Sequence, residues 1–127
     1  MSVNYVVVER GNPANPQAPK KWYAQGKSVG ELTYKQLGKE IAEGGTTVND
    51  TDVLAVLNDL TKVVRRHLSN GEIVRLGDFG SFQVAITSKG AESEAAFNAS
   101  LMEPAKVTFR PGSDLKDMLK TLSYTKA

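Results

Sequence analysis

The sequence predicts an α+β fold, with two helices in the first half of the chain, an antiparallel sheet with a hairpin arm, a short C-terminal helix and an extra N-terminal β-hairpin. Three observations predict it. The β-branched run Val6–Val8 favours a strand near the N-terminus. Apolar residues recur at three- and four-residue steps from Val53 to Leu68, which is typical of a helix. Apolar and polar residues then alternate from Phe82 to Ile86, which indicates a strand.

The first thirty residues predict a hairpin with a long loop. Residues 4–10 and 22–29 are the expected strands. The loop between them carries three prolines: Pro13, Pro16 and Pro19. Proline lacks an amide donor and fixes φ, so we expect residues 11–20 to form an extended loop outside the ladder. We also expect this hairpin to add strands to the main sheet.

Two helices are expected to follow. Thr33 and Gln36 have the spacing of a capping box, and the short helix they begin should end at Gly44-Gly45. Asn49 is expected to cap a second helix that ends at Asn70-Gly71. The apolar face of this second helix is broad for a small protein, so it should contact both its own sheet and a second chain. The expected dimer interface consists of Val53, Leu57, Leu60, Val64, Phe79 and Phe82.

The second half of the chain predicts a hairpin, an arm, a strand and a helix. Ile73–Leu76 and Phe82–Ile86 are the expected hairpin strands, joined by a glycine-containing turn. The alternation is lost over residues 87–104, which we expect to form an arm, a loop or a short irregular turn. Residues 107–109 mark a third strand that Arg-Pro-Gly breaks, and Ser113 is expected to cap the last helix.

Two motifs resemble those of a known family. Segment 74–82, VRLGDFGSF, is similar to the hydrophobic-x-Gly-Phe-Gly-x-Phe turn of bacterial histone-like (HU/IHF) proteins, except that the first glycine is displaced to Gly77. Segment 109–117, FRPGSDLKD, matches in full the second motif of that family, Phe-[Lys/Arg]-Pro-Gly-x-x-Leu-[Lys/Arg]-[Asp/Glu]. The resemblance covers roughly residues 33–122, and residues 1–30 resemble the extension of a subgroup with added strands.

The resemblance implies a non-catalytic, histone-like protein. It implies an intertwined homodimer that binds double-stranded DNA largely independently of sequence, as a nucleoid-associated architectural protein that condenses DNA. Its expected partners are double-stranded DNA and a second copy of the chain, with no cofactor, metal, membrane or small-molecule substrate. We expect residues 1–127 to form one domain, with an HU-like core at 33–122.

The resemblance and the local charge together indicate where DNA would bind. Arg75 should point outward on the sheet face that lies over DNA in this family, or it is simply solvated. The amides of Gly80 and Ser81 are available to a phosphate, or the glycine serves only the turn. Free amides at a helix start, together with two nearby cations, make an anion site. The expected DNA-binding residues are Arg75, Gly80, Ser81, Lys89, Lys106, Arg110, Gly112, Ser113, Lys116 and Lys120.

One departure from the family leaves an alternative function open. The family has a basic arm tipped by Arg-Asn-Pro, but residues 89–104 hold one Lys, three Glu and no Arg-Asn-Pro. Glutamates near a phosphate are repelled. The chain as a whole has 16 Lys and Arg against 14 Asp and Glu, so its formal charge is only +2. The alternative is therefore an HU-type dimeric scaffold that has lost strong DNA affinity and acts as a protein-interaction or structural module.

Two N-terminal segments have both a nucleic-acid and a structural interpretation. Residues 10–13, RGNP, resemble the missing arm tip, but Asn-Pro also commonly starts a turn. Residues 20–23, KKWY, interleave lysines with aromatic rings, a composition that stacks on bases. Aromatic residues at a strand start also bury against a sheet edge while the lysines stay in water.

Several classes of protein are excluded by what the sequence lacks. Without cysteine, it has no disulfide, thiolate metal site or iron–sulfur cluster. His67 is its only histidine, so a metal site built on it is not expected. There is no Gly-x-Ser-x-Gly elbow, Walker loop or dinucleotide fingerprint, so no enzyme is predicted. The lack of a signal peptide and of about 20 consecutive apolar residues predicts a cytoplasmic protein.

Overall fold

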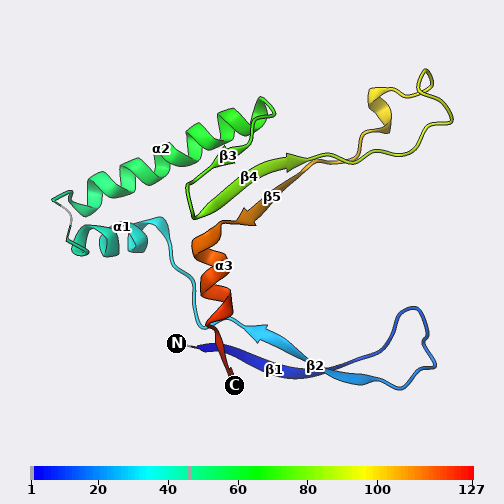
Figure 1. Ribbon diagram of the computed structural model, residues 1–127, viewed down its shortest axis with the longest axis horizontal. Helices are drawn as coiled ribbons and strands as arrows, with labels where there is room; N and C mark the ends of the chain where they lie inside the picture. Colours follow the sequence, from blue (N-terminus) through cyan, green and yellow to red (C-terminus); the bar gives the residue numbers. More distant parts are fainter. Residues whose placement is uncertain (1, 46) are drawn as a thin grey trace. The chain divides into compact units, whose positions relative to one another are not determined.

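The computed structural model describes residues 2–45 and 47–127, and the chain divides into two compact units (Figure 1). The terminal unit consists of Met1–Thr33 together with Met118–Ala127, and the central unit of Tyr34–Asp117. Each unit has its own three-stranded sheet, with strand order β2-β1-β6 in the terminal unit and β3-β4-β5 in the central unit. The fold is α+β, as the sequence predicts.

The terminal unit is built around its first strand. β1 (Ser2–Arg10) pairs antiparallel with β2 (Lys21–Lys27), and Arg10 lies opposite Lys21. On its other edge, β1 pairs in parallel with β6 (Ser123–Lys126). The β-branched residues thus lie in the central strand, where they pack best on a pleated surface.

The prediction that the N-terminal hairpin extends the main sheet is wrong. Both edges of β1 are already paired within the terminal unit, with β2 on one side and β6 on the other. The Ala127 amide continues this pairing by donating to the carbonyl oxygen of Tyr5 at 2.8 Å. β6 is not among the strands that the sequence predicts, since a four-residue strand is too short to show a period.

The proline-rich loop between β1 and β2 is folded into turns, so the expectation of an extended loop is wrong. The Asn15 amide donates to the Asn12 carbonyl at 3.1 Å, and the Ala18 amide donates to the Asn15 carbonyl at 3.0 Å. The side chain of Asn12 accepts a further bond from the Ala14 amide at 2.9 Å. Asparagine side chains stabilise turns in this way. The three prolines do lie outside the β1–β2 ladder, as predicted.

The two predicted helices of the central unit are confirmed, and so are both caps of the second one. α1 spans Tyr34–Glu43 and α2 spans Asp50–Ser69. The Asn49 side chain accepts a hydrogen bond from the Asp52 amide at 2.9 Å, which satisfies a helix-end donor. At the other end Asn70 is the C-cap, followed by Gly71 at φ +80°. The tyrosine hydroxyl of Tyr34 lies 2.7 Å from the hydroxyl of Thr61 and links α1 to α2.

The central sheet has one apolar and one polar face. β3 (Val74–Arg75), β4 (Gly80–Ala85) and β5 (Lys106–Pro111) are antiparallel neighbours. The apolar face holds Phe82 and Phe109, which lie opposite each other with their ring centroids 5.0 Å apart. β3 is shorter than the expected Ile73–Leu76, Ile86 lies beyond β4, and β5 continues to Pro111 instead of breaking before it.

The segment between β4 and β5 forms the arm, drawn in yellow in Figure 1. Its base is paired, because the Glu103 amide donates to the Thr87 carbonyl at 2.9 Å and the Lys89 amide donates to the Leu101 carbonyl at 2.8 Å. Beyond this base it contains turns and the short 3₁₀ helix η1 (Ala99–Leu101). The sequence left an arm, a loop or a short irregular turn open for this segment, and its pairing is confined to the root.

The last helix, α3 (Ser113–Lys120), begins in the central unit and ends in the terminal unit. The Lys116 amide donates to the Gly112 carbonyl at 3.0 Å, so the helical bonding begins at Gly112. Ser113 is consequently the first helical residue, and the prediction that it caps the helix is wrong.

Candidate functional site

The polar face of the central sheet carries a row of cations. Ser81 lies opposite Arg75 on one side and opposite Arg110 on the other, so the three residues share a face. Neighbouring strands lie about 4.8 Å apart, which places the two arginine backbones about 10 Å from each other. Farther along the same face, Gln83 lies opposite Thr108. We call this surface the central basic face; it comprises Arg75, Ser81, Gln83, Lys106, Thr108 and Arg110.

A pocket of about 250 Å³ opens at one end of the central basic face. It is lined by Ile73, Arg75, Gly77, Gly80, Ser81, Gln83, Arg110, Pro111, Gly112 and Lys116. Three of these side chains are cationic and none is a carboxylate. Because like charges converge on one small concavity, the pocket favours an anion such as a phosphate group. We call it the cation pocket.

The cation pocket brings together six of the ten expected DNA-binding residues: Arg75, Gly80, Ser81, Arg110, Gly112 and Lys116. Lys106 shares the central basic face but lies four residues from Arg110, about 13 Å along the strand. Ser113 does not line the pocket, and Lys89 lies at the root of the arm. Lys120 belongs to the terminal unit.

The expected free amides at the start of α3 are partly occupied. The Gly112 amide donates to the Phe79 carbonyl at 2.9 Å, and the Asp114 amide donates to the Asp78 carbonyl at 3.2 Å. These donors are therefore not available to an anion, and the expectation that they would be free is wrong. The positive charge of the pocket comes from the side chains of Arg75, Arg110 and Lys116.

Two glycines allow the turn to approach the start of α3. A Cβ atom on Gly112 would lie 2.3 Å from the carbonyl oxygen of Asp78, which no side chain tolerates. Gly80 has φ +151°, and a Cβ atom there would lie 2.5 Å from the carbonyl oxygen of Arg110. Both glycines are thus required by close backbone approach. This approach holds the cations of β3, β5 and α3 around one pocket.

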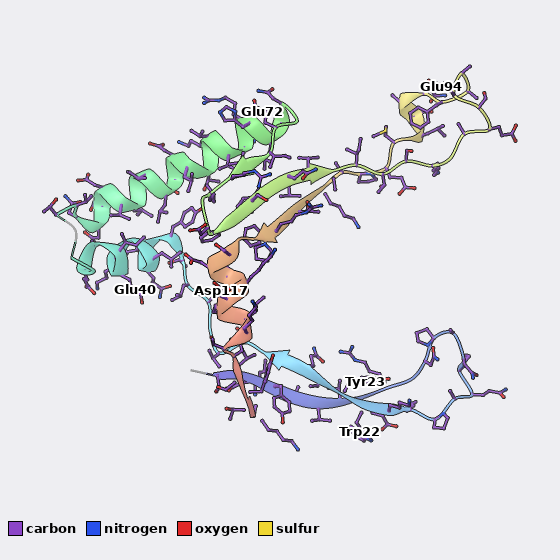
Figure 2. All side chains as sticks on the ribbon, in the orientation of Figure 1. Trp22, Tyr23, Glu40, Glu72, Glu94 and Asp117 are labelled. Atoms are coloured by element: carbon purple, nitrogen blue, oxygen red, sulfur yellow. The ribbon has the colours of Figure 1, made fainter. Side chains whose placement is uncertain are left out.

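The arm carries mostly negative charge, as the sequence indicates. Glu92, Glu94 and Glu103 are exposed, and Lys89 is the only cation of residues 86–105. Figure 2 labels Glu94 on the outer part of the arm. The Thr87 hydroxyl donates to the Glu103 carboxylate at 3.4 Å, near the root. The arm therefore adds little attraction for a polyanion.

A second, apolar surface lies on the opposite side of the central sheet. It is a groove of about 670 Å³ lined by Tyr34, Leu37, Leu57, Leu60, Thr61, Val64, Leu68, Leu76, Phe79, Phe82 and Val107. Five of the six expected interface residues line it, and the sixth, Val53, is instead buried within the chain at 9% exposure. Val53 is the only buried hydrophobic residue that the structure describes, so most apolar side chains of the central unit stay accessible. We call this surface the apolar groove.

Sequence reasoning missed several residues of both surfaces. Gln83 lines the cation pocket, and its position two residues after Ser81 on a strand would have placed it on the same face. Tyr34 and Leu76 line the apolar groove from outside the helix that was used to predict it. Whether these two residues line the groove depends on how α1 and the turn pack. The spacing of apolar residues within one helix gives no information on that packing.

Residues 2–45 and 47–127 contain neither a cluster of metal ligands nor a membrane-spanning helix. No group of three or more His, Cys, Asp or Glu in this part of the chain is placed to hold a metal ion. The Nδ1 atom of His67 lies 3.1 Å from the Glu72 carboxylate instead. No helix among these residues is long and apolar enough to cross a membrane.

Two solved structures resemble the chain. One is a candidate bacterial DNA-binding protein from Bacteroides vulgatus, with a TM-score of 0.67 and 14% identity over 98% of this chain. The chain spans 48% of that protein's length. The other is an HU protein from Anabaena crystallised with DNA, with a TM-score of 0.54 and 21% identity over 71% of this chain and 99% of that one. At these identities the likeness shows the fold, which is HU-like.

The family comparison covers nearly the whole sequence. Residues 1–126 match the family model HU-HIG, described as an HU domain fused to a winged helix-turn-helix, an immunoglobulin-like or a glycine-rich motif. No curated protein matches the sequence significantly. The family match agrees with the two motifs at 74–82 and 109–117 and with the order of elements in the central unit. The chain therefore belongs to the HU-HIG family of HU domains and is a non-catalytic HU-related protein.

Proposed function

We propose that this protein binds double-stranded DNA largely independently of sequence, as an architectural nucleoid-associated protein. The convergence of Arg75, Arg110 and Lys116 on one pocket of the central basic face carries the proposal. The HU protein from Anabaena, which shares the fold, was crystallised with DNA. Contacts to phosphates fix a protein on DNA without reading its sequence.

The proposal assigns different roles to the two faces of the central sheet. On the polar face, the exposed guanidinium groups of Arg75 and Arg110 neutralise phosphates, and Lys106 extends the contact along the same face. The acidic arm lies outside this contact, because Glu92 and Glu94 would repel the duplex. Binding is therefore weak and governed by salt.

We also propose that the active form is a homodimer joined through the apolar groove. Leu57, Leu60 and Val64 line the groove from α2, and Phe79 and Phe82 line it from the sheet. An apolar surface of this kind is covered when the same patch of a second copy docks on it. The dimer has two cation pockets, which doubles the number of phosphates that one particle contacts.

The proposal is tested by titrating a random-sequence duplex with the protein at 50 and 200 mM salt. Each neutralised phosphate contributes about −0.9 to the slope of log affinity against log salt, so about four to six contacts per dimer imply a loss of about 10²–10³ in affinity. We expect a second duplex of unrelated sequence to give the same affinity within about threefold.

The same titration distinguishes the alternative function. The acidic arm and the charge of +2 favour a protein-interaction scaffold without strong DNA affinity. If duplex binding is unmeasurable even at 50 mM salt, the DNA-binding proposal is wrong and the scaffold remains. A salt slope near zero with measurable affinity would also contradict the proposed phosphate contacts.

A further inference from the structure

The charges of the protein are divided unevenly between its two units. The terminal unit holds six Lys and Arg against two Glu, which gives it a net charge of +4. The central unit holds ten Lys and Arg against twelve Asp and Glu, a net charge of −2, and the two values add up to the +2 of the whole chain. The net positive charge therefore lies in the unit that the proposed function does not use.

Strand register places the cations of the terminal hairpin on one face. Arg10 lies opposite Lys21, and Lys27 lies opposite Asn4 at the other end of the strand pair. Because side chains alternate between faces, these three cations share their face with Tyr23 and Gln25. We call this surface the terminal basic face; it comprises Lys21, Tyr23, Gln25 and Lys27 of β2 and, opposite them, Arg10, Val8, Val6 and Asn4 of β1.

The carboxylate nearest in sequence lies on the opposite face. Glu9 lies opposite Trp22, in the pair next to Arg10 and Lys21, so its side chain leaves the strand on the other face. Figure 2 labels Trp22 and Tyr23, which occupy successive positions on β2 and so leave it on opposite sides. Arg10, Lys21 and Lys27 form no ion pair with any residue that the structure describes. The terminal basic face therefore presents cations that no carboxylate of these residues neutralises.

A cleft of about 540 Å³ lies at the loop end of this face. Its lining includes Arg10, Asn12, Pro13, Lys21 and Tyr23. The Arg10 guanidinium donates to the Gln25 side-chain oxygen at 3.5 Å, which orients it along the strand pair. Tyr23 is 48% exposed, so its ring is accessible beside the two cations. An accessible ring next to cations suits the phosphates and sugar or base surfaces of a nucleic acid.

We propose that the terminal basic face is a second nucleic-acid contact of this protein, in which Arg10, Lys21 and Lys27 bind the phosphodiester backbone of DNA. Lys21 and Lys27 are six residues apart on one strand, which is about 20 Å. Successive phosphates of one strand advance about 3.4 Å along a duplex, so this distance spans about six nucleotides. The face is thus long enough for several phosphate contacts, and it adds to the cation pocket without depending on it.

The test compares the wild-type full-length chain with R10Q/K21Q/K27Q, using a fluorescent 20-bp random duplex and anisotropy at several salt concentrations. Three lost phosphate contacts reduce the salt slope by about 2.7 for each protomer that contacts the DNA. We expect duplex affinity at 50 mM salt to fall at least about tenfold. The matched control is K35Q/K39Q/K62Q, which removes the same charge from exposed positions of α1 and α2, and R10K/K21R/K27R keeps the charge. Both should bind within about twofold of wild type.

A 20-nucleotide single strand distinguishes the two possible forms of the ligand. A larger loss on the single strand than on the duplex, reproduced by Tyr23→Leu, assigns the face to unpaired DNA with a base on the ring. An equal or larger loss on the duplex assigns it to the duplex backbone. Melting curves by circular dichroism establish that each variant is folded.

The inference is wrong if R10Q/K21Q/K27Q binds both the duplex and the single strand with the same affinity as the control K35Q/K39Q/K62Q. The terminal basic face would then be available to an acidic protein surface and not to DNA. A parallel variant, R75Q/R110Q/K116Q, separates this failure from failure of the proposed function. If only the central variant loses affinity, the inference is wrong and the proposed function stands. If only the terminal variant loses affinity, the inference stands and the assignment of the phosphate contacts to the cation pocket is wrong.

Discussion

Replacing Leu60 with Asp is expected to give a chain that neither dimerises nor unfolds cooperatively. Leu60 lines the apolar groove, and a carboxylate there would be buried without a partner in every protomer. Burying a leucine contributes about 1.5–3 kcal/mol, and the buried charge adds a further cost. Sedimentation and a circular dichroism melt at micromolar concentration measure both effects.

Val56→Asp is the matched control for this prediction. Val56 lies on the same helix, is 64% exposed and does not line the apolar groove. It should remain dimeric and melt within a few degrees of the wild type. A wild-type chain that sediments as a well-folded monomer would contradict the dimer, and a dimeric Leu60→Asp chain would show that the groove is not its interface.

The triple variant R75Q/R110Q/K116Q is expected to lose duplex affinity by about 100-fold or more at 50 mM salt. It removes the three cations of the cation pocket from each protomer, and with them most of the four to six proposed phosphate contacts. The loss should be alike for all sequences, and the salt slope should flatten. Fluorescence anisotropy with two unrelated duplexes measures both quantities.

The control for this variant is K35Q/K39Q/K62Q, whose charge change is identical and whose side chains lie on α1 and α2. Glutamine keeps much of the side-chain length, so a loss in the pocket variant reports charge and not packing. Equal losses in the two variants would mean that net charge, and not the cation pocket, governs binding.

The helix ends of the central unit were predictable because their signals are local. Asn49 caps α2 through a bond to an amide three residues later, and Gly71 follows the C-cap with positive φ. Both depend on residues that are neighbours in sequence. The polar face of the central sheet was also predictable, since Ser81 and Gln83 alternate with apolar residues along β4.

The sheet of the terminal unit was not predictable in the same way. Its third strand comes from Ser123–Lys126, more than a hundred residues from its partner β1. Four residues are too few to show a hydrophobic period. Parallel strands are also not joined by a tight turn, so no turn sequence indicates that they pair. The separate sheet thus depends on a long-range pairing that the sequence of the hairpin alone does not specify.

Six residues of the cation pocket were expected from the sequence, but the hydrogen bonding of its backbone amides was not. The motif at 109–117 indicated Arg110 and Lys116, and the structure brings them together with Arg75. The amides expected to assist them are bonded to the carbonyls of Asp78 and Phe79. That contact requires the turn to touch the start of α3, which is a tertiary approach, and Gly80 and Gly112 are its only sign in the sequence.

A backbone amide NMR titration of the wild-type protein with a random-sequence duplex shows directly whether DNA contacts the cation pocket. We expect the amides of Arg75, Ser81, Arg110 and Lys116 to shift progressively with added DNA, and those of Lys35 and Lys39 to stay unchanged. Raising the salt from 50 to 200 mM should reverse the shifts. Shifts that are absent from the cation pocket, or confined to the arm at 86–105, would mean that the cation pocket does not bind DNA.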